Sequence, residues 1–312
     1  MGRRAAETIL HGIVAALVVM VLLRAGRIRA PEIRLRFWLL AMGLPLGGTP
    51  LFWLLAPWRL GERFRDDWAL FSASHLSPWA FHGVELARAS ALLLALAGAA
   101  LFLRDVIPFV LDFPRGRVKD QAVTAPPPAL LSASERAATA LGITVPRLAV
   151  VTSKHSILIC RGLRRPIIVA STGLCEMLTP DELEAAVAHE MTHAKHRDPT
   201  LGWGLMLVRA FCFFNPAVQL AARAAVAEIE ARADQSAAHI VGSTEAVARS
   251  LRKLSGIDSA PAPRTWHGFR LAAIEERCQA LLGKGRVAAA PSPWILPATA
   301  IGLGVILFLT VA

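Results

Sequence analysis

The segment TPDELEAAVAHEMTHAKHRDP, from Thr179 to Pro199, carries the strongest helix signal in the chain. Thr179 has a side chain suited to an N-cap, and Pro180 suits the first helical position. Glu182 stands three residues after Thr179, which makes a capping box. Pro199 disfavours helical backbone at the residue before it. The sequence therefore predicts a helix from Pro180 through Arg197.

This helix contains His189, Glu190 and His193 in the pattern HExxH. Two histidines four positions apart lie on one helical face, so both imidazoles can bind one metal ion. Glu190 is turned aside, where its carboxylate can contact a metal-bound water instead of the metal. A pattern this short also arises by chance in ordinary helices, so a third ligand has to decide between the two interpretations.

His196 is one candidate for the third ligand. No glycine breaks the helix between His193 and Gly202, so the chain is expected to stay helical there. His196 then lies too far along the helix axis to share a metal ion with His189. We expect His196 to be a solvated residue at the helix end.

A carboxylate on a later helix is the stronger candidate. The segment AEIEARAD places Glu230 and Asp234 four positions apart on one face, whereas Glu228 lies on another face and is the weaker candidate. Taken alone, such a pair indicates only a solvent-exposed face of a helix. After an HExxH segment, Glu230 completes a set of two histidines and one glutamate, which suits one zinc ion with water in the fourth position. Asp234 can accept the second ring N–H of a ligand histidine.

The composition indicates a membrane protein. Of 312 residues, 54% are hydrophobic and 18% are charged, against about a quarter charged in soluble domains. Disorder, coiled coil and a collagen-like fibre are excluded, because so much apolar surface needs covering. The apolar residues are concentrated in runs, which predict four membrane spans: Thr8–Leu23, Phe37–Trp58, Ala89–Leu103 and Trp294–Ala312. The first run is also compatible with a signal peptide, although no clear cleavage site follows it.

The net charge of +11 comes almost entirely from arginine. The arginines cluster beside the apolar runs and no nucleic-acid motif is present, so we expect contact with the lipid bilayer and no direct nucleic-acid binding. The first loop holds five arginines between Arg24 and Arg36 against Glu32 alone, which predicts a cytoplasmic loop. Both termini are then expected on the outer, non-cytoplasmic side of the cytoplasmic (inner) membrane. Four cysteines without a CxxC pair indicate neither a disulfide framework nor a zinc knuckle.

The spans divide the chain into residues 1–112 with three helices, a cytoplasmic segment 113–286, and a last span in 287–312. Pro126–Pro128 is typical of a stiff linker, and Ser132 is a candidate cap for a helix over Ala133–Leu141. Short β-branched runs predict a small sheet. They are Arg147–Thr152, Ser156–Cys160 and Pro166–Ala170.

Three further segments follow the HExxH helix. Leu201–Phe214 is compatible with a fifth span, a re-entrant segment or a helix packed at the membrane surface, and its shortness favours the last. Asn215-Pro216 opens a helix that we expect to end at Gly242. A loop over Ile257–Arg264 then precedes an amphipathic helix over Phe269–Leu282.

Three quoted segments resemble the BlaR/MecR-type membrane zinc peptidases (peptidase family M-fifty-six): AVAHEMTHAKHRDP (Ala186–Pro199), the FFNP step (Phe213–Pro216) and EARAD (Glu230–Asp234). Three spans, a metalloprotease domain and a fourth span are also that family's layout. The resemblance implies an α-helical integral membrane protein with about four transmembrane helices and an α+β gluzincin-type metalloprotease domain.

The resemblance also implies site residues and one departure. The zinc ligands would be His189, His193 and Glu230, with Glu190 catalytic and one zinc ion bound. The family's sensor-transducers carry a penicillin-binding domain after the fourth span, whereas this sequence stops at Ala312. Direct sensing of β-lactams by acylation is therefore not expected.

HtpX-type and CAAX-prenyl-type membrane proteases share HExxH and ExxxD. In HtpX-type enzymes two spans separate these motifs, but between His193 and Glu230 this chain has room for at most one apolar helix. Three functions stay open: a zinc endopeptidase in regulated proteolysis or signal transduction that cuts, for example, a cytoplasmic transcriptional repressor; an HtpX-like quality-control protease; and a metal-binding signalling scaffold without turnover.

For an endopeptidase we expect hydrolysis by a metal-activated water with Glu190 as general base. The run Pro166, Ile167, Ile168, Val169 and Ala170 is either an edge strand that pairs with the substrate or an ordinary core strand. The chain has no tyrosine, so a tyrosine cannot stabilise the transition state. His239 and His155 are candidate donors for that task, although isolated histidines are more often structural.

Overall fold

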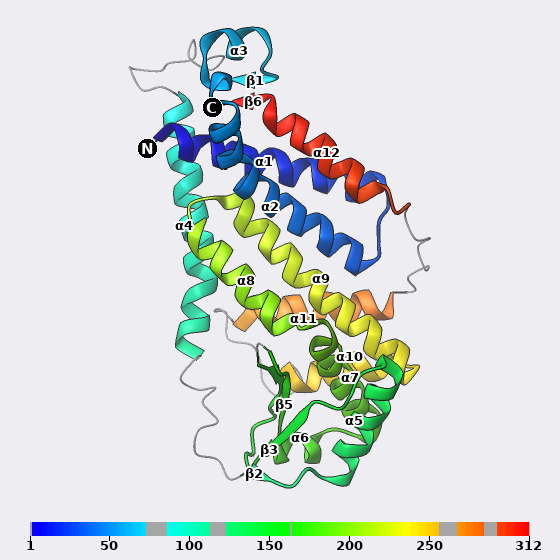
Figure 1. Cartoon of the computed structure of the whole chain (residues 1–312). Helices are drawn as coiled ribbons and strands as arrows, with labels where there is room; N and C mark the ends of the chain where they lie inside the picture. Colours follow the sequence, from blue (N-terminus) through cyan, green and yellow to red (C-terminus); the bar gives the residue numbers. More distant parts are fainter. Residues whose placement is uncertain are drawn as a thin grey trace. The chain divides into compact units, whose positions relative to one another are not determined.

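The structure is a computed structural model that describes residues 2–72, 86–112, 123–162, 164–255, 267–283 and 292–311. The chain forms two compact units (Figure 1). Unit 1 comprises Met1–Arg115, Leu205–Glu228 and Ala288–Ala312, and unit 2 comprises Gly116–Gly204 and Ile229–Val287. Residues 205–228 thus belong with the expected spans and not with the rest of the segment 113–286.

Unit 1 is built from apolar helices: α1 (Gly2–Ala25), α2 (Pro31–Leu55), α4 (Leu86–Asp112) and α12 (Ile295–Phe308). Glu7–Ala25 and Pro31–Leu55 are long and apolar enough to cross a membrane, whereas Leu92–Arg104 and Ile295–Phe308 are shorter apolar helices. The 14 residues of α12 rise about 21 Å, less than the roughly 30 Å of a bilayer core. Two of the four expected spans are thus supported by helix length and composition.

The side chain of Arg59 connects the N-terminal and C-terminal segments of unit 1. After α2 come a short 3-10 helix, η1 (Pro57–Leu60), α3 (Glu62–Asp67) and β1 (Phe71–Ser72), which pairs in parallel with β6 (Thr310–Val311). Arg59 of η1 is fully buried and donates to the carbonyl oxygens of Phe308 (2.6 Å), Thr310 (2.9 Å) and Leu307 (3.2 Å). Its charge lies 3.3 Å from Glu7. Arg59 therefore connects α1 with the carbonyl groups at and just beyond the C-terminal end of α12.

Unit 2 contains a mixed four-stranded sheet in the order β2-β3-β5-β4. Its strands are β2 (Val123–Thr124), β3 (Arg147–Val151), β4 (Leu158–Arg161) and β5 (Ile167–Ser171). β3 and β5 are parallel, and the other two pairs are antiparallel. The sheet predicted from the three β-branched runs is therefore present, with β2 as an additional strand.

The strand β5 lies in the middle of this sheet. It pairs with β3 on one side and β4 on the other, so its backbone groups are already used. The interpretation of Pro166–Ala170 as an edge strand for substrate is therefore wrong, and the run is a core strand. Buried Ile168, Val169 and Ala170 agree with a strand covered on both faces.

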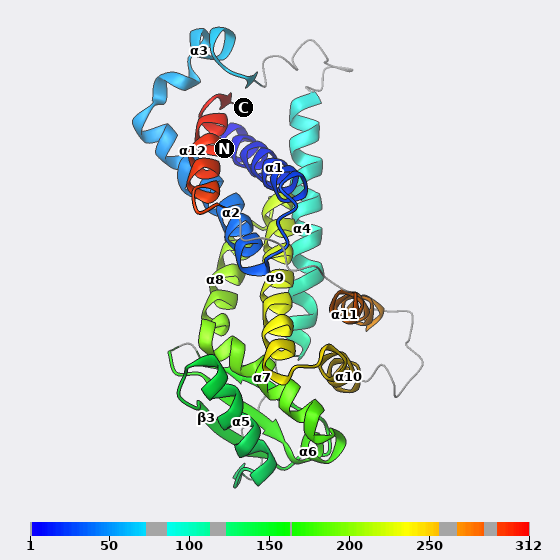
Figure 2. The same cartoon turned by 90° about the vertical axis from the view of Figure 1, so that its right-hand side faces the viewer.

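Unit 2 also contains the helices α5 (Pro128–Leu141), α6 (Thr172–Met177), α7 (Pro180–His196), α10 (Thr244–Ser255) and α11 (His267–Leu282). Of these, α6 and α7 contact the sheet directly, and α5 and α10 pack against α7. The core includes Leu130 of α5, Ile168 of β5 and Met191 of α7. α10 packs against both α7 and α11 (Figure 2).

The start of α5 differs from the prediction. Pro127 is the N-cap and Pro128 the first helical residue, because the fixed backbone angle of proline suits that position. Ser132 is inside the helix, where its hydroxyl donates to the carbonyl oxygen of Ala129 at 3.1 Å. Pro128 therefore belongs to the helix and not to a linker, and Ser132 is not a cap.

The two long helices begin and end close to the predicted residues. α7 has the capping box of Thr179 and Glu182, and Arg197 is its C-cap. α8 (Asp198–Phe211) follows, and α9 (Pro216–Val241) begins where the Asn215 side chain accepts the N–H groups of Ala217 and Val218. Residues 257–264, the predicted loop, lie outside the described residues.

Candidate metal centre

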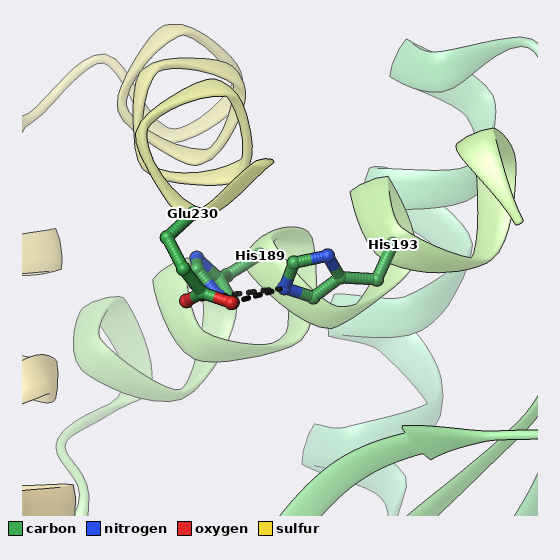
Figure 3. A group of neighbouring side chains, drawn as sticks. All are labelled: His189, His193 and Glu230. Atoms are coloured by element: carbon green, nitrogen blue, oxygen red, sulfur yellow. Dashed lines mark hydrogen bonds and ion pairs between the residues drawn. The ribbon is translucent and has the colours of Figure 1, made fainter. Parts of the chain in front are cut away.

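Three side chains from two helices of unit 2 lie together. His189 and His193 are on α7 and Glu230 is on α9, with one potential ligand atom from each within 4.8 Å of the others (Figure 3). The two Nε2 atoms are 3.0 Å apart. Glu230 Oε2 lies 3.6 Å from His189 Nε2, and Oε1 lies 3.8 Å from His193 Nε2.

These separations fit one zinc ion. Tetrahedral ligands about 2.0–2.2 Å from a zinc ion lie about 3.4 Å from one another. The separations of 3.0, 3.6 and 3.8 Å, the last two to different oxygens of Glu230, lie near that value. Two imidazoles and one carboxylate are also a donor set that zinc takes with a fourth position open. The residues present therefore suit the ion that the sequence predicts.

Each histidine has an aspartate at its other ring nitrogen. His189 Nδ1 lies 3.0 Å from Asp234 Oδ1, and His193 Nδ1 lies 2.8 Å from Asp198 Oδ2. We assign the ring proton to Nδ1 in both, because a carboxylate accepts and does not donate. In the metal-bound state both Nε2 lone pairs would then be directed to the side of Glu230.

Each aspartate is in turn bound by an arginine. Arg277 of α11 donates to Asp234 through Nε at 2.8 Å and through NH2 at 2.7 Å, and its NH1 lies 2.9 Å from Glu230 Oε2. Arg232 of α9 donates to Asp198 Oδ1 at 2.5 Å. The site therefore consists of two His–Asp–Arg chains that meet at Glu230.

Asp234 lies where the sequence predicts it, at a ring nitrogen of a candidate ligand histidine, whereas the contacts of Asp198, Arg232 and Arg277 are not predicted by the sequence. Asp198 lies just beyond the helix that carries His193, in the segment Arg197-Asp198-Pro199. A predicted turn at Arg197 would have brought Asp198 back toward His193. No sequence signal links Arg277 to the site, because it comes from a separate helix.

His189 and Glu230 carry opposite charges in the absence of metal. Burial disfavours charge on His189, yet the carboxylates of Asp234 and Glu230 raise the pKa of its imidazole to about 10. Burial likewise disfavours charge on Glu230, but His189 and Arg277 lower the pKa of its carboxyl group to about 2. Without metal, His189 is thus a cation beside an anion, and a metal cation can take the place of its proton.

Glu190 lies beside this cluster and faces the sheet. Its Oε2 accepts the backbone N–H of Cys160 in β4 at 2.6 Å. Burial raises the pKa of the Glu190 carboxyl group, against the lowering effect of His189 and His193. A carboxylate with a raised pKa is a stronger base, as proton abstraction near neutral pH requires.

The remaining candidates lie apart from the cluster. His196 is exposed, and Glu228 binds Arg34 at 2.6 Å within unit 1. His239 follows Glu230 by nine residues of continuous helix, which places it about 13 Å along the axis and on the opposite face. Its role as a transition-state donor stays a prediction.

His155 is exposed in the segment between β3 and β4. Its backbone N–H binds the Ser153 hydroxyl at 3.2 Å. Among the described residues, no contact joins His155 to His189, His193 or Glu230, and its role as a donor stays a prediction.

Parts of this chain are similar in sequence to known protease homologues of the HtpX type. Protease HtpX homologues from Moorella thermoacetica, Methanocaldococcus jannaschii and Thermococcus kodakarensis are 40%, 34% and 33% identical to parts of this chain. These matches cover 24%, 20% and 20% of this chain. The chain spans about a quarter of the length of these curated relatives: 25%, 23% and 22%.

The model of the family described as BlaR1 peptidase M56 matches residues 93–281. This match contains the HExxH segment of α7 and the EARAD segment of α9, and it covers more than half of the chain. This protein belongs to the BlaR1 peptidase M56 family.

Proposed function

We propose that this protein is an integral-membrane zinc metalloendopeptidase. One observation carries the proposal: the potential ligand atoms of His189, His193 and Glu230 lie within 4.8 Å of one another. Glu190 lies on α7, the helix that also carries the two histidines. The side chains of His189, His193 and Glu230 would hold one zinc ion in a gluzincin-type domain. Bound there, zinc would polarise the scissile carbonyl group and lower the pKa of a water molecule.

The proton transfers fall to Glu190. Its carboxylate takes a proton from the attacking water and delivers it to the leaving amine. Burial suits both steps, because a carboxyl group with a raised pKa accepts a proton and then holds it until the amine departs. Asp234 and Asp198 keep the two histidines in the orientation that leaves Nε2 available.

The substrate would pair with β4. Within the described sheet β4 is an outer strand, and the carbonyl oxygen of Ile157 already accepts the N–H of Ser171. Because backbone groups alternate sides along an antiparallel strand, those of Leu158 and Cys160 face away from β5. The Cys160 N–H bonds to Glu190 at 2.6 Å, which supports a position of this edge beside the general base. An extended peptide that pairs with the backbone groups of Leu158 would then present its own backbone to Glu190.

The membrane arrangement is also part of the proposal. We propose three spans in residues 1–112, a cytoplasmic protease domain within 113–286 and a last span in 287–312, with both termini outside. The two candidate spans, the arginine-rich first loop and the family match support it. In this arrangement the enzyme would cut a cytoplasmic regulator, such as a transcriptional repressor, in regulated proteolysis.

A second candidate is quality control of membrane proteins. The three curated relatives described above are all HtpX homologues, which favours it. A metal-binding signalling scaffold without turnover is the third possibility, and it needs no general base.

One experiment separates the three. Cells that carry wild-type protein or Glu190→Gln are compared by proteomics, and the zinc content of both purified proteins is measured. A regulatory protease yields fragments of soluble regulators only with the wild type, and a quality-control protease yields fragments of misfolded membrane chains. A scaffold gives identical fragments in both strains, and that result would overturn the endopeptidase proposal.

A further inference from the structure

Arg277 uses every nitrogen of its guanidinium on the metal centre. Nε and NH2 bind the two oxygens of Asp234 at 2.8 and 2.7 Å, and NH1 lies 2.9 Å from Glu230 Oε2. Its side chain is 23% exposed, and that of Asp234 is 4% exposed. A fork of this kind fixes the plane of a carboxylate as well as its position.

Arg277 also resolves an electrostatic conflict on α9. Glu230 and Asp234 lie one turn apart on the same face, and two carboxylates at that spacing repel each other. Arg277 lies within hydrogen-bond distance of both and compensates their charge. With its plane fixed, Asp234 presents Oδ1 to His189 Nδ1 at 3.0 Å, while Glu230 keeps its oxygens 3.6 and 3.8 Å from the two Nε2 atoms.

Neither α7 nor α9 supplies this cation, because Arg277 belongs to α11. That helix also contacts α10 through residues other than Arg277. Arg252 NH2 lies 3.2 Å from both oxygens of Glu275, and Cys278 Sγ lies 3.6 Å from the carbonyl oxygen of Ala248. A substitution at Glu275 therefore alters α11 without removing any of the contacts that Arg277 makes with Asp234 and Glu230.

We propose that Arg277 is a positioning residue of the metal centre, which holds Glu230 as a ligand and, through Asp234, holds His189. The helix α11 thereby completes a site to which it contributes no ligand. The inference rests on the proposed function, since it assumes that His189, His193 and Glu230 bind metal.

The test measures metal binding in the purified full-length protein in detergent. The zinc dissociation constant is determined by competition with a chelator, and the visible spectrum of the Co²⁺-substituted protein reports the ligand geometry. The variants are Arg277→Met, Arg277→Lys and, as the matched control on the same helix, Glu275→Gln.

We expect Arg277→Met to weaken zinc binding by about 10- to 100-fold, as is typical when the residues behind metal ligands are removed, and to alter the Co²⁺ spectrum. Arg277→Lys restores the charge but not the fork, so it should recover only part of the affinity. Glu275→Gln should match the wild type in both measurements.

Wild-type affinity and spectrum in Arg277→Met would overturn the inference, and so would full recovery by Arg277→Lys, because charge alone would then suffice. If Arg277→Met does not fold, Arg277→Lys against the wild type decides in the same way. A wild-type protein that binds no zinc refutes the proposed function, whereas equal binding by wild type and Arg277→Met refutes only the role of Arg277.

Discussion

Asp198 lies directly behind His193, with Oδ2 2.8 Å from the ring Nδ1. The backbone makes this contact possible. Arg197 adopts a left-handed conformation with φ of 54°, which ends α7 and turns the chain back. Asp198 then opens α8, where an acidic side chain suits the positive end of the helix dipole. A single turn therefore ends the HExxH helix and supplies the carboxylate that orients its second histidine.

Replacing this carboxylate should weaken metal binding. We expect Asp198→Asn to raise the zinc dissociation constant by about 10- to 100-fold, because the amide carries no charge and can present an NH2 group to His193. Chelator competition on the purified protein measures the change. Asp181→Asn is the control, since Asp181 is an exposed acid in the first turn of α7. Equal affinities for Asp198→Asn and wild type would show that His193 needs no carboxylate.

Glu190→Gln should separate chemistry from metal binding. The amide cannot accept a proton, so peptidase activity should fall by about 10²- to 10⁴-fold while the zinc content stays unchanged. Cleavage of a peptide library and metal analysis supply the two measurements. Glu184→Gln is the matched control on the same helix, because Glu184 forms only a partly exposed ion pair with Arg136, which contributes little to stability. Loss of zinc from Glu190→Gln would contradict its role as a base.

Glu182 should make the stability of unit 2 depend on pH. Burial alone would raise the pKa of its carboxyl group, but Lys253 at 2.7 Å and the N–H of Thr179 at 3.0 Å hold the pKa below 4.5. The stabilisation is therefore present above pH 4.5 and is lost as pH falls through the lower pKa of the folded state.

The corresponding variant is Glu182→Gln. It should lower the free energy of unfolding by about 1–3 kcal/mol at neutral pH, since hydrogen bonds to a charged group are lost. The difference from the wild type should shrink below pH 4.5. Unfolding of metal-free protein followed by circular dichroism across a pH series checks this, and a difference that does not vary with pH would contradict it.

Close packing at Gly98 should make that position sensitive to one methyl group. A Cβ atom there would lie 2.5 Å from the backbone carbon of Phe214 and 2.6 Å from its oxygen. Gly98→Ala should therefore destabilise unit 1 by about 1–3 kcal/mol. Gly47 of α2 has no atom within 4 Å of the same position, so Gly47→Ala should leave the melting temperature unchanged or raise it. Equal melting temperatures for both variants would argue against the contact between α4 and Phe214.

Short-range signals account for what the sequence determined. The capping box of Thr179 and Glu182 and the proline at position 180 define the start of α7, and Asn215 with Pro216 does so for α9. The spacing of His189 and His193 follows from the helical period alone. Each of these features depends on hydrogen bonds or side chains within about one helical turn, so the residues themselves specify it.

Tertiary structure decided what depends on distant segments. The order of strands placed β4 at the edge of the described sheet and β5 in the middle, although both strands begin with two aliphatic residues. The left-handed turn at Arg197 brought Asp198 behind His193, and packing of α11 brought Arg277 to Asp234 and Glu230. Sheet order and ion pairs between helices arise from contacts between residues far apart in the chain, which no local pattern encodes.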